Sequence, residues 1–334
     1  MAHRPINMAA SLLRVQNGGI PLRAEERLAE EAGPNKKLFT SDLSVNEFLL
    51  ARSAGCHPIA QIMGSSIYHI GQIPDYKGKT AEISVISDAH RESRRRALSR
   101  LRQEAVLVGA DAVIGAHLRD RMITMGARGK GGDDGGEVIE FTVVGTAVKA
   151  PFLARPPGQP IITDLSGQDL WALVQEGWEP CAFLFDFCKY HGWHVTSGSG
   201  GVGEVTDANQ CVETARQIVM QRLTEQARAA SVEFVVGSDV TIEVKEVPCG
   251  YGGCKLDDLD VNVSWFGTGI RRIPNWQTPA RDVPPLMLSM MSLGKRRDTR
   301  LGGDDDDERE IERAAEDAEE NALALDEANE PDDG

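Results

Sequence analysis

The sequence has no run of about 18 apolar residues, the length that a membrane-spanning helix needs. Its N-terminal segment also lacks the order of a secretory signal peptide, because Gly18, Gly19 and the charged segment 23–31 stand where an apolar stretch would be required. We therefore expect a cytoplasmic protein that has no membrane partner.

Cysteine is scarce. The 334 residues include six cysteines, which is too few for the disulfide framework that stabilises small secreted proteins. One of them, Cys56, lies early in the chain, and the other five come later: Cys181, Cys188, Cys211, Cys249 and Cys254. We expect reduced thiols.

The chain has no excess of basic residues, with 36 Lys and Arg against 51 Asp and Glu and a formal net charge of -15. The segment from Asp304 to Gly334 holds 16 acidic residues against Arg309 and Arg313, so nearly all of the net charge belongs to this tail. A surface that binds nucleic acid must be basic to displace counterions from phosphates, and we expect no nucleic-acid partner. The low apolar content of the tail predicts disorder and the recruitment of a protein partner.

One pattern recurs along the chain at a fixed offset of 122 residues. The offset relates Asp42-Leu43-Ser44 to Asp164-Leu165-Ser166, Gly55 to Gly177, Tyr68-His69 to Tyr190-His191, Arg100-Leu101 to Arg222-Leu223, and Gly145-Thr146 to Gly267-Thr268. This period exceeds that of solenoid and propeller repeats, so each copy is expected to be a whole domain with its own core.

The offset predicts that the chain is divided into six parts. They are an N-terminal extension (1–36), a first domain (37–150), a proline-rich linker (151–159), a second domain (160–274), a linker rich in proline and methionine (275–302) and an acidic tail (303–334). The apolar segment 286–293 is interpreted either as a docking peptide for a protein partner or as a segment that packs on its own domain.

The sequence pattern of each copy predicts the same order of helices and strands. A short extended segment precedes a helix that begins with a capping box, Ser44 with Glu47, and Ser166 with Asp169 is its near equivalent. A strand, a long helix and two strands follow, at 59–73, 89–108, 112–118 and 138–148, and again at 181–195, 211–229, 234–240 and 261–270. The expected fold class is α+β, with two homologous β-α-β-α-β-β domains whose helices pack on a mainly antiparallel sheet. Most arginines of the first long helix are expected on a solvated face.

Four segments resemble a known family. They are Phe39-Thr40-Ser41-Asp42-Leu43-Ser44, the stretch from Met63-Gly64 to Tyr68-His69, Gly109-Ala110-Asp111-Ala112 and Gly145-Thr146-Ala147-Val148. They resemble the YbjQ-like family, which carries a heavy-metal-binding label, closely over residues 37–150 and more loosely over 160–272. The resemblance implies a small α+β domain that forms ring-shaped homo-oligomers, namely pentamers, in the bacterial cytoplasm. It implies no defined set of metal ligands.

The histidines that both copies keep, His69 and His191, are candidate metal ligands, because imidazole binds transition metals such as zinc or copper. In a ring, the same histidine of each subunit would converge on the axis. Cys188 precedes His191 by three residues and is a further candidate, although this spacing places the two on opposite faces of a strand. The alternative is that these histidines are hydrogen-bonded residues of a core or an interface.

Cys249 and Cys254 form a C-x4-C pair in a glycine-rich loop. Two thiolates supply half of the ligands that zinc prefers, so a metal site there would need ligands from elsewhere. An ordinary loop between two strands is the alternative, and the corresponding loop of the first copy, 126–136, contains no cysteine.

No nucleophile with a base, cofactor fingerprint or metal-hydrolase motif repeats in both copies, and the glycine-rich loop 126–136 lacks the ending of a phosphate loop. The leading hypothesis is therefore a noncatalytic, oligomeric scaffold or binding protein. A heavy-metal-binding protein that uses the histidines and cysteines above is the alternative. The third is an enzyme that acts on an unknown small molecule at subunit interfaces.

Overall fold

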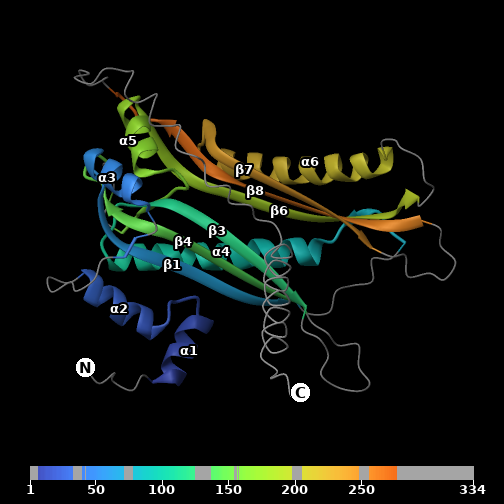
Figure 1. The fold of residues 1–334 in the computed structure, drawn as a ribbon, viewed down its shortest axis with the longest axis horizontal. Helices are drawn as coiled ribbons and strands as arrows, with labels where there is room; N and C mark the ends of the chain where they lie inside the picture. The colour runs from blue at the N-terminus through green and yellow to red at the C-terminus, as the bar shows by residue number, and fades with distance from the viewer. Residues whose placement is uncertain are drawn as a thin grey trace, which may run out of the picture. The chain divides into compact units, whose positions relative to one another are not determined.

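A computed structural model describes residues 7–32, 40–41, 43–70, 78–124, 137–153, 156, 158–197, 205–247 and 256–276 (Figure 1). In chain order, their elements are α1 (Met8–Gln16), α2 (Leu22–Ala32), α3 (Val45–Ser53), β1 (His57–Ile70), β2 (Ala81–Glu82), α4 (Ser84–Leu107), β3 (Ala112–Thr124), β4 (Glu137–Lys149), β5 (Ile161–Ile162), α5 (Gly167–Gln175), β6 (Trp178–Ser197), α6 (Thr206–Ala229), β7 (Phe234–Val247) and β8 (Leu256–Arg272). The acidic tail and the apolar segment 286–293 lie outside the described residues.

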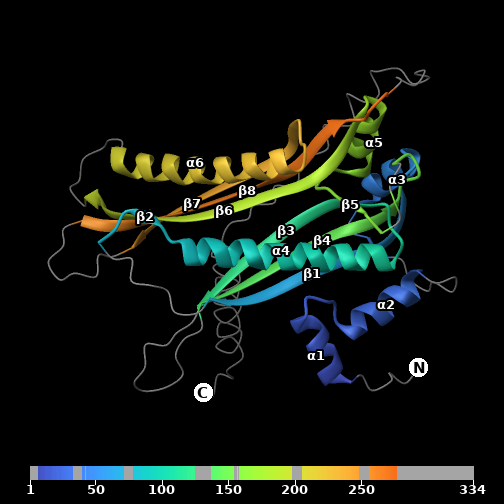
Figure 2. The ribbon, with the colours of Figure 1, turned by 180° about the vertical axis from the view of Figure 1, so that it is seen from behind.

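The strands form two four-stranded sheets, in the orders β1-β4-β3-β5 and β2-β6-β8-β7. Neighbouring strands are antiparallel except β3 and β5, which pair in parallel. Helix α4 packs on β1 and β4, and α6 packs on β6 and β8 (Figures 1 and 2). The expected α+β class, with helices on mainly antiparallel sheets, is confirmed.

Strand pairing follows the offset of 122 residues between what we call the first half (37–150) and the second half (160–274). His57 pairs with Lys149, and Glu179 pairs with Arg271. The pairing of β3 with β4 is interrupted after Ile114, and that of β7 with β8 is interrupted after Val236. We call two residues related by the offset counterparts.

Each sheet includes a short strand from the other half, which the sequence did not predict. Strand β5 of the second half pairs with β3, and β2 of the first half pairs with β6. The predicted boundary at residues 151–159 therefore separates β5 from the sheet that it completes. The division of the chain into two domains stays a prediction.

The two long helices begin five residues before their predicted starts, at Ser84 and Thr206 instead of Ala89 and Cys211. The residues that precede them, Ile83 and Val205, make no side-chain hydrogen bond to the first turn. Because no capping side chain is present, the sequence carries no local signal for these helix starts. Helix α3, in contrast, has the predicted capping box.

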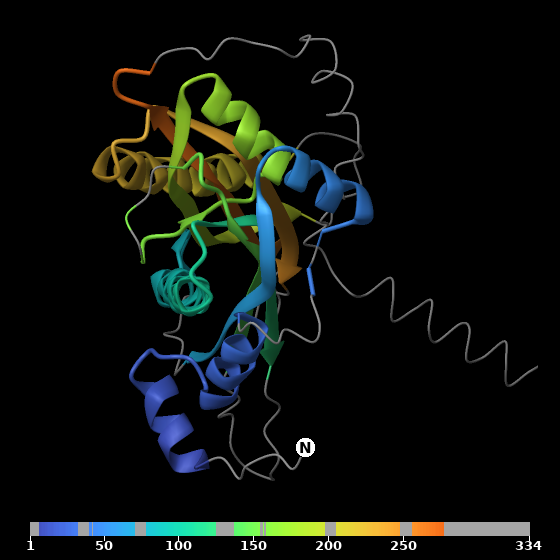
Figure 3. The ribbon, with the colours of Figure 1, turned by 90° about the vertical axis from the view of Figure 1, so that its left-hand side faces the viewer.

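The N-terminal helices α1 and α2 lie beside α4 and β1 (Figure 3). Arg27 of α2 pairs with Glu104 of α4 at 3.3 Å, and it donates to the carbonyl oxygen of Gln61 on β1 at 3.4 Å. These contacts attach the extension to the first half, and isolated helices as short as α1 and α2 would be marginally stable alone.

A hydrophobic cluster joins the two halves. Its buried residues come from α3, β3, β4 and the segment after β4 on one side and from β5 and α5 on the other: Ala51, Cys56, Ala112, Ile114, Val148, Ala150, Leu153, Ile161, Leu170 and Val174. Gly167 is required at the contact, because a Cβ atom there would lie 2.8 Å from the Cβ of Ala51.

Both long helices end with the same backbone geometry. Gly109 after α4 has φ +68°, and its counterpart Ser231 after α6 has φ +54°. In each case two amides bond back to the last turn; the Ser231 amide, for example, donates to the carbonyl oxygen of Arg228 at 3.2 Å. A left-handed backbone costs a residue with a Cβ atom about 1–2 kcal/mol, so Ser231 is strained where Gly109 is not.

We predict that Ser231→Gly raises the free energy of unfolding by about 0.5–1 kcal/mol, because part of the relieved strain is offset by the greater freedom of glycine in the unfolded chain. Urea denaturation followed by circular dichroism measures this change. The matched control Gly109→Ser should lower the stability, and an equal loss in both variants would show that the strain is absent.

Candidate functional site

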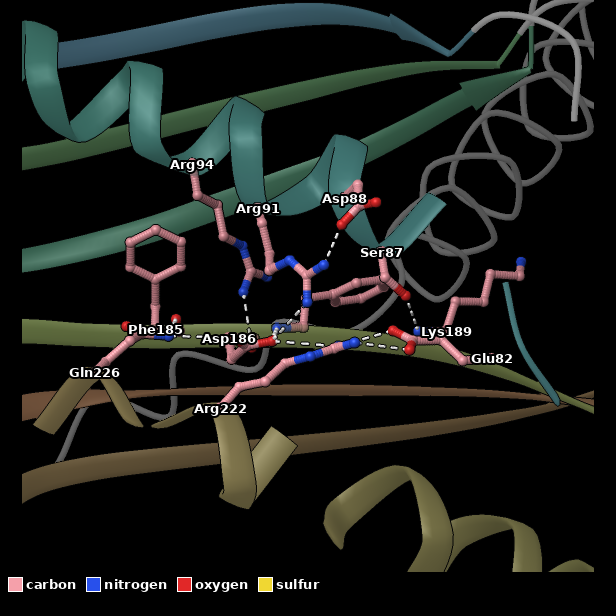
Figure 4. A network of polar contacts seen from close by, with 11 residues as sticks. Glu82, Ser87, Asp88, Arg91, Arg94, Phe185, Asp186, Lys189, Arg222 and Gln226 are labelled. Atoms are coloured by element: carbon pink, nitrogen blue, oxygen red, sulfur yellow. Dashed lines mark hydrogen bonds and ion pairs between the residues drawn. The ribbon is translucent and has the colours of Figure 1, made fainter. Parts of the chain in front are cut away.

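A network of polar side chains connects α4, β6 and α6 (Figure 4). Its centre is Asp186 on β6, whose side chain is 2% exposed. Gln226 of α6 donates to its carboxylate at 3.1 Å, and Arg91 of α4 and Arg222 of α6 lie 3.6 and 3.9 Å away. Arg94 of α4 donates to its backbone carbonyl oxygen at 3.4 Å. The two long helices thus meet at one buried carboxylate.

Glu82 extends the network to β2. Both carboxylate oxygens accept hydrogen bonds from Arg222, at 2.8 and 2.7 Å. Burial raises the pKa of Glu82, but the hydrogen bonds of Arg222 and Ser87 and the charges of Arg222 and Arg91 together lower it by more, so the net shift is downward. A residue of the first half therefore forms a bidentate ion pair with a helix of the second half.

The charges of the network balance one another. Arg94 donates to Asp120 at 3.1 Å, Lys189 pairs with Asp260 at 3.1 Å, and Arg91 also pairs with Asp88. Burial raises the pKa of Asp186, against the opposing effects of the Phe187 amide and the arginines. Two ion pairs of the network, Arg91 with Asp186 and Arg222 with Glu82, cross between the halves and hold them in one orientation, because a buried charge is costly without its partner.

His90 of α4 lies beside this network, stacked on Phe187 with the ring centroids 3.8 Å apart. Burial, with the nearby charge of Arg94, lowers its pKa to about 3. The imidazole is therefore neutral at physiological pH and packs as an aromatic ring in the contact between the halves.

His191, a predicted metal ligand, is buried on β6 between two aspartates. Its Nδ1 atom lies 2.8 Å from an oxygen of Asp260, and its Nε2 atom lies 3.6 Å from an oxygen of Asp258. Asp260 also pairs with Lys189, and Asp258 accepts the amide of His194 at 2.9 Å. The two carboxylates fix the orientation of the imidazole.

Of the other predicted metal ligands, the structure describes Cys188 and His69 and brings neither into a metal-binding group with His191. Cys188 lies in the hydrophobic cluster under α6, where burial raises the pKa of its thiol to about 12, whereas His69 is exposed on β1. Cys249 and Cys254 lie outside the described residues. Within the described part of the chain, no group of three or more His, Cys, Asp and Glu residues could hold a metal ion.

The sequence pattern did not identify the residues of the network. The expectation of a solvated face is wrong for Arg94, whose side chain is 3% exposed, because this face of α4 packs against β6. One signal was present in Asp186, a charged residue within an apolar stretch, since a buried charge requires partners. Nothing local indicated that Glu82 would be one of the partners.

Comparison with known proteins identifies a family model and a related protein that this chain resembles. A family model described as "Putative heavy-metal-binding", YbjQ, matches residues 74–151. The chain is also 34% identical over 232 residues to the Mycobacterium tuberculosis protein named "Encapsulin nanocompartment protein Rv1762c", an alignment that covers 67% of this chain and 84% of that protein. The chain belongs to the YbjQ-like family. No solved structure matches it.

The family match falls within the first half, from the segment before β2 to the end of β4. It therefore includes Glu82, Arg91 and Arg94, which contact the second half.

Among the described helices, none combines the length and apolar character needed to cross a membrane.

We predict that Asp186→Ala lowers the free energy of unfolding by about 3–5 kcal/mol, because the arginines around it would lose a buried partner. Asp88→Ala is the matched control: this aspartate also pairs with Arg91, but its side chain is 64% exposed. Its removal should cost less than about 1 kcal/mol. Chemical denaturation compares the two, and equal losses would contradict the central role of Asp186.

Proposed function

We propose that this protein is a noncatalytic component of an encapsulin nanocompartment system, which assembles with copies of itself and binds a protein partner. The likeness to an encapsulin nanocompartment protein carries this proposal, because it extends over 84% of that relative. The two proteins therefore share most of a fold and not merely one short motif.

The arrangement of charges supports a role as a rigid binding unit. The buried carboxylate of Asp186 and the partly buried carboxylate of Glu82 are engaged by arginines of α4 and α6, so they serve the contact between the halves. Large apolar side chains remain exposed on β7, among them Phe234 and Val244. Exposed apolar surface on a sheet is typical of a site of protein association.

The proposal also specifies the oligomer and the segments that contact the partner. The YbjQ-like family favours a ring of five subunits in the cytoplasm of a bacterium. The acidic tail (303–334), together with the methionine-rich segment 286–293, would contact the partner, because the tail carries most of the net charge.

The test is co-sedimentation of the purified protein with encapsulin nanocompartments. We expect the full chain to sediment with them, and a variant that ends at Arg281 to keep its own assembly but lose this association. The variant ends at Arg281, where the chain divides into its two units. Co-sedimentation of neither protein would contradict the proposed function, and co-sedimentation of both would contradict the role of the tail.

Metal binding is the second candidate function, and the enclosed position of His191 beside Asp258 and Asp260 is the observation that favours it. An imidazole whose second nitrogen is oriented by a carboxylate is a common arrangement in metal sites. Because His191, Asp258 and Asp260 do not form a metal site by themselves, Cys249 and Cys254 would have to supply ligands from their loop.

Elemental analysis of untagged protein, followed by titration with zinc and copper, measures metal binding. If the second candidate is correct, the protein takes up about one metal ion per chain, as one site requires, and both His191→Ala and the pair Cys249→Ser with Cys254→Ser reduce the uptake. His69→Ala on the exposed part of β1 is the control for adventitious surface binding. Uptake far below one equivalent would exclude metal binding as the function.

A further inference from the structure

The contact between the two halves of the chain contains a strand-edge interface. The segment that begins with β5 extends along β3: the amides of Gly115 and Ala116 donate to the carbonyl oxygens of Leu165 and Thr163, both at 2.9 Å. The Thr163 amide donates in return to the carbonyl oxygen of Val113 at 3.0 Å. Helix α5 follows directly and packs on α3 through Gly167.

The counterpart of β3 in the second half has the same backbone shape but no covering segment among the described residues. Strand β7 is the last strand of its sheet, so its outer edge is unpaired in the described part of the chain. Gly237 has φ +65°, close to the +60° of Gly115, whose amide receives the incoming segment. The strand-edge backbone shape that pairs with an incoming segment is therefore present on both β3 and β7. Within the described residues, only the β3 edge is paired.

The exposed fractions of the side chains also differ between β3 and β7. Val113 of β3 is fully buried, whereas its counterpart Val235 is 44% exposed. Phe234, the counterpart of the buried Ala112, is 57% exposed. These apolar residues define a surface on β7 that matches the part of β3 already covered by the second half of the same chain.

The first half carries the complementary surface. Ser41, Leu43 and α3 are the counterparts of Thr163, Leu165 and α5, which form the covering segment. In α3, Val45 and Leu49 are 75% and 56% exposed. Their counterparts, Gly167 and Trp171, are buried and half-buried at the existing contact. Each described chain thus presents one unpaired strand edge, on β7, and one exposed apolar face, formed by Val45 and Leu49 of α3.

We propose that a second copy of this chain docks α3 and the residues just before it on the outer edge of β7. This proposal rests on the self-assembly in the proposed function and names the surface that performs it. The Gly237 and Ser238 amides of one copy donate to the carbonyl oxygens of Leu43 and Ser41 of the next, as Gly115 and Ala116 donate within the chain. The interface joins two different surfaces, so the copies associate head to tail and either close into a ring or extend.

The test uses one charged substitution on each surface of the full chain, Val45→Asp on α3 and Val235→Asp on β7, with Leu13→Asp on α1 as the control, since Leu13 is also largely exposed. Sedimentation velocity measures assembly. We expect each of the first two variants to weaken self-association at least about tenfold, because a carboxylate would enter an apolar contact, and the control to associate like the unaltered protein.

Mixing the two weakened variants separates a head-to-tail contact from misfolding. Each variant keeps the surface that the other has lost, so the mixture should form one-to-one dimers that neither variant forms alone. Failure of the mixture to form dimers overturns the proposal, as does unchanged assembly of both variants, and the proposed function survives either result. A monomeric unaltered protein would instead refute the self-assembly on which both proposals rest.

Discussion

Burial of the Asp186 carboxylate is the constraint on which the arrangement of the two halves depends. A desolvated charge is costly unless its partners are held in place, and its partners here come from two helices that lie far apart in the sequence. Arg91 belongs to α4 and Arg222 to α6, so neither helix can move relative to β6 without exposing or abandoning the carboxylate. The bidentate pair of Arg222 with Glu82 extends this constraint to β2.

The exchange of β2 and β5 between the sheets adds a second, independent constraint. Hydrogen bonds along a strand edge require a fixed register, and the hydrophobic cluster of α3 and α5 fixes the same position through side-chain packing. Together these contacts make the first half part of the environment in which the second half folds.

Counterpart residues in the two halves differ within one backbone plan. Gly64 on β1 admits the backbone of α4 so closely that a Cβ atom would lie 2.0 Å from the Ala97 carbonyl oxygen. Its counterpart on β6 is Asp186, which contacts α6 through the Gln226 side chain instead. One position thus serves close packing in the first half and charge pairing in the second.

The sequence by itself determined the regular elements and their repetition. The offset of 122 residues anticipated matching strand registers, and the capping box at Ser44 marked the start of α3, because both depend on residues close together or on alternation along a strand. Only the tertiary structure decided which sheet each short strand joins, that Arg94 is buried and that His191 lies between Asp258 and Asp260. Those outcomes depend on contacts between residues distant in the chain, for which local pattern carries no physical signal.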